Sequence, residues 1–111
     1  REDWNDATAH FDEALAIAEH NGDGPVAFST RTNLTRALLE QQDLDRAQPY
    51  LDAIVLERPE NTEVYRLQAR MAWERGNAAL AAEFMTLARN GAGEAWSEDD
   101  TARLELYRAG N

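Results

Sequence analysis

The 111-residue chain contains no cysteine and no lysine, and each absence excludes a kind of chemistry. Without cysteine the chain can form neither a disulfide nor a thiolate metal site. Without lysine it has no side-chain amine for Schiff-base catalysis, and all 11 of its Lys-or-Arg residues are arginines. The compartment stays open, because a chain without cysteine suits a reducing or an oxidising environment equally well.

Long apolar runs are also absent, since none approaches the roughly 20 residues that a membrane-spanning helix needs. Acidic residues outnumber arginines 21 to 11, and the net charge of −10 repels phosphate backbones and anionic lipid surfaces. We therefore expect neither a nucleic-acid partner nor insertion into a membrane. A hydrophobic fraction of 43% suits one folded domain, and the start without methionine leads us to expect a piece of a longer protein.

Apolar and alanine residues recur at helical spacing, with no sustained two-residue alternation that would indicate strands. The sequence therefore predicts an all-α protein. Pro59 is expected to stop one helix and Ser97 to cap the start of another. Four glycines can also close helices: Gly76, Gly91, Gly93 and Gly110. These signals predict six helices, at residues 3–20, 26–41, 44–57, 62–75, 78–90 and 97–109.

The chain repeats itself with a period of 34 residues when units start at Phe28, Thr62 and Trp96. Small residues then fall into register in the second helix of each unit, at Ala47 and Ala81. The other equivalent positions are Leu38, Ala72 and Leu106; Leu39, Trp73 and Tyr107; Leu51 and Met85; Ile54 and Ala88; and Gln42, Gly76 and Gly110. A 34-residue unit of two helices resembles the tetratricopeptide repeat.

This resemblance implies an α-α superhelix of helical hairpins in one domain that spans residues 1–111. A hairpin cannot bury its apolar stripe alone, so neighbouring hairpins stack and share a core. The last unit departs from the family pattern, because Asp99 stands where an aromatic residue is usual and Arg103 where a small one is. Arg31 also stands at the position where an aromatic residue is usual. Pro49 falls inside a predicted helix. The implied parts are a partial unit at 1–27, repeats at 28–61 and 62–95, and a partial repeat at 96–111.

Two interpretations of the N-terminal helix are open. It is the second helix of a repeat unit if its apolar residues are aligned with an offset of 40 residues. That offset pairs Trp4, Ala7, Phe11 and Ala14 with Leu44, Ala47, Leu51 and Ile54. It is a first helix if the spacing of its aromatic and small residues decides, at Trp4, Ala7, Thr8 and Phe11. The first interpretation places six extra residues around positions 17–25.

By the same resemblance, the first helices line a concave groove that binds a peptide or a protein segment. The two aromatic residues implied for that groove, Trp73 and Tyr107, either bind the partner or pack between the helices. The full set is Thr32, Arg36, Leu39, Glu40, Arg66, Arg70, Trp73, Glu74 and Tyr107. The corresponding positions of the last unit also include Asp100, Leu104 and Arg108.

Three of these residues, Arg36, Arg66 and Arg70, would form a positive strip beside Trp73. Guanidinium groups bind carboxylates through paired hydrogen bonds, so the strip suits a partner with acidic side chains or a free C-terminal carboxylate. The alternative is that the arginines pair with acids of the chain itself, such as Glu40, Glu63 and Glu74.

No catalytic, metal or cofactor site is predicted. His10 has only Asp6 and Glu13 near it on its helix face, too few ligands for a metal site with a supporting shell. Neither Ser29 nor Ser97 lies in a strand-turn-helix elbow, and no glycine-rich phosphate loop is present. We expect the acidic run 98–100 to be a solvated first turn of a helix.

The sequence therefore predicts a non-catalytic protein-interaction module. One alternative is a sensor or regulatory segment of a larger bacterial signalling or transcription protein, suggested by the 40-residue offset. Another is a structural element of an envelope or polysaccharide export assembly. The oligomeric state is not indicated.

Overall fold

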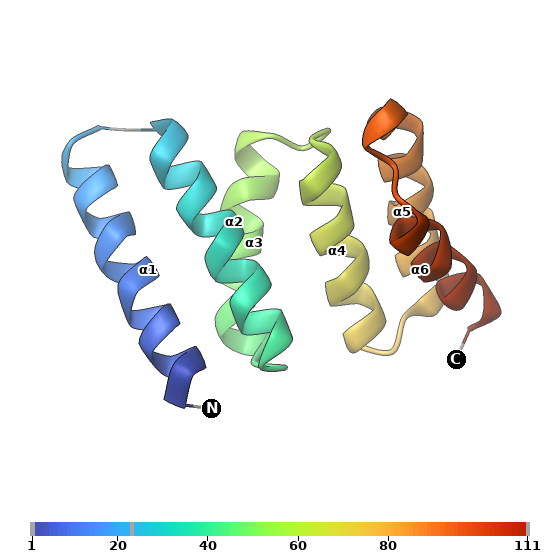
Figure 1. The fold of residues 1–111 in the computed structure, drawn as a ribbon, viewed down its shortest axis with the longest axis horizontal. Helices are drawn as coiled ribbons and strands as arrows, with labels where there is room; N and C mark the ends of the chain where they lie inside the picture. The colour runs from blue at the N-terminus through green and yellow to red at the C-terminus, as the bar shows by residue number, and fades with distance from the viewer. Residues whose placement is uncertain (1, 23, 111) are drawn as a thin grey trace. The chain divides into compact units, whose positions relative to one another are not determined.

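The computed structural model describes the backbone of residues 2–22 and 24–110, and the side chains of residues 9, 10, 12–22 and 24–110. Every element of this part of the chain is helical (Figure 1). The α-helices are α1 (Glu2–His20), α2 (Gly24–Glu40), α3 (Leu44–Glu57), α4 (Thr62–Glu74), α5 (Ala78–Ala92) and α6 (Glu98–Ala109), and a 3₁₀ turn, η1 (Gly93–Ala95), follows α5. The predicted all-α class is confirmed, and no helix in the described part is long and apolar enough to cross a membrane.

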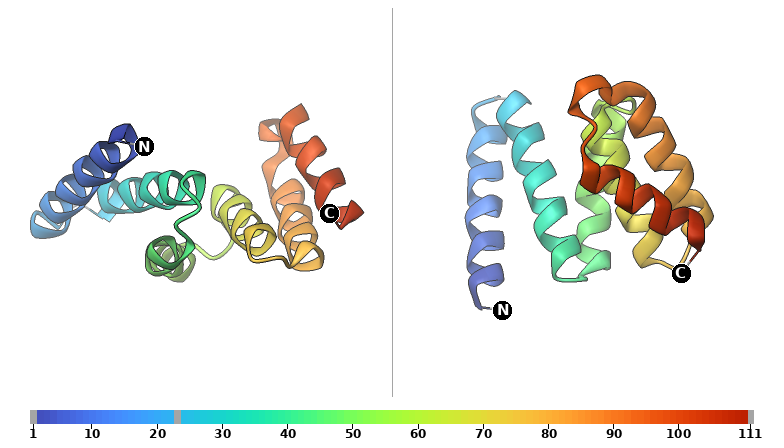
Figure 2. Two further views of the ribbon diagram at one scale, coloured as in Figure 1. Left: turned by 90° about the horizontal axis from the view of Figure 1, so that it is seen from below. Right: turned by 45° about the vertical axis from the view of Figure 1, so that its right-hand side comes forward.

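The backbone divides into two compact units, residues 1–57 and 58–111. In the first unit α2 packs against both α1 and α3, and in the second α5 packs against both α4 and α6 (Figure 2). The division falls in the turn between α3 and α4, beside the repeat boundary expected between Asn61 and Thr62. Each unit is therefore a small stack of successive helices with its own core.

Local sequence signals account for most helix ends. Asn61 caps α4 by accepting a hydrogen bond from the Val64 backbone N–H, and Ser97 caps α6 in a reciprocal capping box with Asp100. The prediction for Gly91 is wrong, because this glycine lies inside α5, which runs past its predicted end to Ala92. A Cβ atom at Gly91 would lie 3.3 Å from the Thr62 hydroxyl oxygen, so the close approach of the start of α4 explains the glycine.

The ends of α2 and α4 share one backbone conformation, 34 residues apart. The Asp43 N–H donates to the Leu38 carbonyl at 2.9 Å, and the Asn77 N–H donates to the Ala72 carbonyl at 2.8 Å. A left-handed residue precedes each donor, Gln42 with φ 60° and Gly76 with φ 85°. Gly110 ends α6 with φ 80°, so the 34-residue register extends to the last helix.

The core positions follow the same register. Ala47, Ile54, Ala81 and Ala88 are fully buried, and Leu51 and Met85 are nearly so. Leu106 breaks the pattern, because 46% of it is exposed whereas its equivalents Leu38 and Ala72 are buried. Helix α6 packs against α5, and Leu106 lies on a side of α6 that this packing leaves exposed.

The first unit contains two departures from a regular hairpin. Pro49 lies inside α3, as predicted, and its side chain is exposed. One residue later, the Tyr50 hydroxyl donates to Asp12 Oδ1 at 3.0 Å and ties α3 to α1.

The 40-residue offset of α1 is only partly open to comparison. The side chains of Trp4, Ala7, Thr8 and Phe11 lie outside the described residues. Ala14 is exposed whereas Ile54, with which the offset pairs it, is fully buried, so the expected equivalence fails at that position. Leu15 and Ala18 are instead the buried residues in the described part of α1.

Replacing Ala47 or Ala81 by leucine is expected to lower the free energy of unfolding by about 1–3 kcal/mol, because a fully buried alanine leaves no space for three more carbons. Urea unfolding followed by circular dichroism measures the change. Ala79, exposed on α5, is the matched control position and should tolerate leucine. Unchanged stability at both buried positions would mean that the helices do not pack through these alanines.

Candidate binding faces

The nine residues expected to bind a partner lie on helices of both units. Within the first unit, α2 carries Thr32, Arg36, Leu39 and Glu40. Within the second, α4 carries Arg66, Arg70, Trp73 and Glu74, and α6 carries Tyr107. Each unit therefore has a candidate face of its own.

On α2, burial removes two of the four residues from contact with solvent. Thr32 is 7% exposed, and its hydroxyl donates to the Phe28 carbonyl of its own helix at 2.9 Å. Leu39 is 1% exposed. Arg36 and Glu40 remain exposed, and Arg36 Nη1 donates to Asn33 Oδ1 at 3.0 Å. The accessible chemistry of this face is therefore one guanidinium and one carboxylate.

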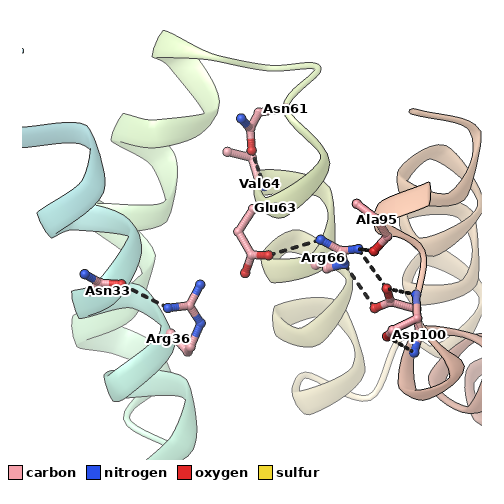
Figure 3. Close-up of polar contacts among 9 residues, drawn as sticks. Asn33, Arg36, Asn61, Glu63, Val64, Arg66, Ala95 and Asp100 are labelled. Atoms are coloured by element: carbon pink, nitrogen blue, oxygen red, sulfur yellow. Dashed lines mark hydrogen bonds and ion pairs between the residues drawn. The ribbon is translucent and has the colours of Figure 1, made fainter. Parts of the chain in front are cut away.

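On α4, Arg66 is the centre of a polar network inside the second unit (Figure 3). Its Nε and Nη2 atoms donate to the two carboxylate oxygens of Asp100 at 3.0 and 2.7 Å, which is the bidentate geometry of a strong ion pair. Nη1 donates to Glu63 Oε1 at 3.3 Å, and Nη2 also donates to the Ala95 carbonyl at 3.0 Å. One side chain thus connects α4 with η1 and with the start of α6.

The electrostatics agree with this geometry. The hydrogen bond with Asp100 raises the pKa of Arg66 and outweighs the opposing effect of burial. Burial by itself raises the pKa of Asp100. The hydrogen bonds from Arg66 and from Ser97 lower this pKa by more than burial raises it, so the pKa of Asp100 lies below its ordinary value. Both groups are therefore held in their charged forms.

The expectation that the acidic run 98–100 is solvated is wrong for its last member. Only 10% of the Asp100 side chain is exposed, and it accepts hydrogen bonds from the Ser97 backbone N–H as well as from Arg66. Two sequence signals could have indicated this role. The Ser-Glu-Asp-Asp run has the spacing of a capping box, and Asp100 occupies the repeat position of Arg66 with the opposite charge.

Arg70 and Glu74 form the second ion pair on α4. Arg70 Nε donates to Glu74 Oε2 at 3.0 Å, one helical turn away, and both side chains are partly exposed. The alternative interpretation of the arginines, pairing with acids of the chain, thus describes Arg66 and Arg70 in this structure. It identified Glu63 and Glu74 as partners but missed Asp100.

Trp73 and Tyr107 contact each other between α4 and α6, with ring centroids 5.1 Å apart and planes tilted by 37°. Tyr107 is only 3% exposed and belongs to a core cluster with Met85 and Leu104. Tyr107 therefore packs in the core of the second unit in this structure. Trp73 is only partly buried against the same cluster, so it retains surface for a partner.

Within the part of the chain that the structure describes, no three histidine, cysteine or acidic side chains gather to hold a metal ion. His10 is exposed, and the Asp6 side chain lies outside the described residues. Ser97 is engaged as the cap of α6. The accessible side chains on α2 and α4 are charged groups and one indole, which can contact another molecule through ion pairs and through aromatic packing.

Stacked helices with a recurring 34-residue register define an all-α helical-repeat protein. The sequence matches the tetratricopeptide repeat family over residues 1–71, and the chain belongs to that family. No curated protein and no solved structure matches it.

Tetratricopeptide repeats generally mediate protein–protein interaction by binding proteins or peptides, and the family is typically non-catalytic. The family match covers α1, α2, α3 and most of α4.

Proposed function

We propose that the chain is a non-catalytic module that binds peptide or protein segments on its first helices, with the accessible part of α2 in the first unit and the accessible part of α4 in the second as separate contact faces. The observation that carries this proposal is the grouping of Arg70, Trp73 and Glu74 within one turn of α4. All three are partly exposed, and the buried Tyr107 supports the indole from behind. An aromatic anchor beside a guanidinium is a common feature of binding hot spots.

The partner that suits these faces carries acidic side chains or a free C-terminal carboxylate. A carboxylate can take the place of Glu74 at Arg70, because an ion pair between residues four apart on one helix typically contributes only about 0.3–0.5 kcal/mol. Trp73 would add a cation–π or apolar contact worth about 0.5–2 kcal/mol. On α2, the exposed Arg36 offers a second guanidinium.

Arg66 is given a different role from the one expected of it. Its Nε and Nη2 atoms both donate to Asp100, and Nη2 also donates to the Ala95 carbonyl. Because a partner carboxylate would have to displace a bidentate pair that also organises the start of α6, we assign Arg66 to the structure of the unit. Arg36 and Arg70 are the arginines proposed to bind.

The test is a fluorescence titration with two pools of peptides rich in aspartate and glutamate, one with free C-terminal carboxylates and one amidated. Replacing Arg36 and Arg70 together by alanine should lower affinity for the free-carboxylate pool at least about tenfold, corresponding to roughly 1.4 kcal/mol. Binding should also weaken as salt is added.

The matched control replaces Arg58 and Arg89, both exposed, by alanine, which removes the same amount of charge. This variant should bind almost as well as the original chain. If both double variants bind equally, the proposed faces are not the site. If neither pool binds at any salt concentration, the proposed partner chemistry is wrong.

A further inference from the structure

The chain contains two asparagine–glycine pairs, Asn21–Gly22 and Asn90–Gly91, and the structure places them in different surroundings. An asparagine before a glycine readily loses its side-chain amide, because the glycine nitrogen has no neighbouring side chain to hinder its attack on the asparagine Cγ atom. The attack requires the backbone between the two residues to rotate, since a helical backbone keeps the nitrogen away from Cγ. The rate therefore depends on how firmly the fold holds each pair.

The pair Asn90–Gly91 is held by a helix and by its neighbour. Both residues lie within α5, where each backbone N–H bonds to the carbonyl four residues back. Gly91 also lies close to the start of α4, since a Cβ atom placed on it would be 3.3 Å from the Thr62 hydroxyl oxygen. The Gly91 nitrogen can therefore attack Asn90 only after the last turn of α5 has opened.

The pair Asn21–Gly22 lies outside a helix, in the turn that follows the end of α1. Asn21 is exposed, and the Gly22 N–H donates to the Glu19 carbonyl at 3.2 Å, the long end of the range for such a bond. A Cβ atom placed on Gly22 would meet no other part of the described chain within 4 Å. Breaking this long hydrogen bond releases the Gly22 nitrogen for attack without moving a packed helix.

We propose that Asn21 is a site of spontaneous deamidation in the folded chain, whereas Asn90 is protected. The Gly22 nitrogen gives up its proton and bonds to Cγ of Asn21, and the bond from Cγ to the amide nitrogen breaks, so that this nitrogen leaves with the proton as ammonia. Water then opens the cyclic imide at either carbonyl, which leaves aspartate or isoaspartate at this position. The net reaction converts an amide and water into a carboxylate and an ammonium ion.

The modification changes the end of α1 in two ways. The new carboxylate adds negative charge at the C-terminus of the helix, where the helix dipole disfavours it, in a chain whose net charge is already −10. An isoaspartate also inserts an extra backbone carbon before Gly22 and so displaces its N–H from the Glu19 carbonyl. The first unit is therefore less stable after the conversion.

Incubation of the 111-residue chain at mildly alkaline pH, folded and in concentrated urea, tests the proposal. Cleavage after arginine places the two pairs in separate peptides, residues 2–31 and 90–103, in which mass spectrometry measures the loss of the amide. In the folded chain Asn21 should be converted at least about tenfold faster than Asn90, because Asn90 reacts only from a locally opened helix. In urea the two rates should approach each other.

Two variants serve as controls. Asn21→Gln should abolish the fast conversion in the peptide 2–31, which assigns the signal to Asn21 rather than to Asn5 of the same peptide. Asn21→Asp carries the new charge without the backbone change. Urea unfolding followed by circular dichroism should give a lower midpoint for the converted chain than for the fresh one, and Asn21→Asp should lie between them.

Conversion of Asn90 as fast as Asn21 in the folded chain would overturn the proposal. A folded chain in which Asn21 stays intact while the urea-unfolded chain reacts would overturn it as well. An unchanged urea midpoint after conversion would contradict the expected loss of stability. Neither measurement involves a bound peptide, so this proposal and the proposed function can fail independently.

Discussion

Replacing Asp100 by alanine is expected to lower the free energy of unfolding of the second unit by about 2–4 kcal/mol. The substitution removes half of the capping box of α6 and the bidentate partner of Arg66, whose side chain is only 22% exposed. A guanidinium left partly buried without its carboxylate is costly. Urea unfolding measures the change. Two of the three tryptophans, Trp73 and Trp96, belong to this unit, so fluorescence measured in a Trp4→Phe background reports on it.

The neighbouring Asp99→Ala is the control, since Asp99 lies in the same helical turn but is exposed. It should cost less than about 0.5 kcal/mol. Replacing both Arg66 and Asp100 by alanine should lower the free energy of unfolding by less than the sum of the two single replacements. Each single replacement leaves the other charged side chain without its partner, whereas the double replacement does not. Equal losses for Asp99→Ala and Asp100→Ala would show that the ion pair contributes nothing.

The same pair predicts a dependence on pH. The pKa of Asp100 lies below its ordinary value of 3.8 in the folded chain, so the folded state favours the carboxylate. This stabilisation is complete above the ordinary pKa and is lost as the pH falls through the lowered pKa. The difference in stability between the original chain and Asp100→Asn should therefore be constant near neutral pH and shrink below about pH 4.

Tyr107→Ala is expected to lower the free energy of unfolding by about 3–4 kcal/mol, because it removes a nearly fully buried aromatic ring from the core cluster of the second unit. The loss includes the contact with Trp73, whose ring centroid lies 5.1 Å away. Thermal and urea unfolding measure it, and the fluorescence of Trp73 should shift as its environment becomes wetter.

Two controls distinguish packing from binding. Tyr107→Phe keeps the ring and should cost less than about 1.5 kcal/mol, while Leu106→Ala, one residue away but half exposed, should cost far less than the loss of the ring. If Tyr107→Ala weakened peptide binding without any loss of stability, Tyr107 would be a contact residue rather than a packing residue.

Helix positions were predictable because local signals decide them. Each predicted helix begins and ends within two residues of the bounds that the structure describes, and α3 runs from Leu44 to Glu57 as predicted. Apolar spacing, the caps at Asn61 and Ser97, and the glycines at Gly76 and Gly110 act within a few residues of chain. Gly91 was misinterpreted, because its role depends on Thr62 of another helix.

The candidate binding residues were predictable only as positions on helices. The 34-residue period places Thr32, Arg66 and Asp100 at one repeat position, yet the first is buried against its own helix and the other two form an ion pair. Periodicity says which residues are equivalent, whereas exposure depends on the side chains of neighbouring helices.

The sequence by itself determined the helical class, the repeat period and the family, because these depend on spacing along one chain. Only the tertiary structure decided that Arg66 is bound to Asp100, that Thr32, Leu39 and Tyr107 are buried, and that Leu106 is exposed. These outcomes require knowing which side chains meet when helices pack. Charge pairing and burial are properties of that contact rather than of the residues taken singly.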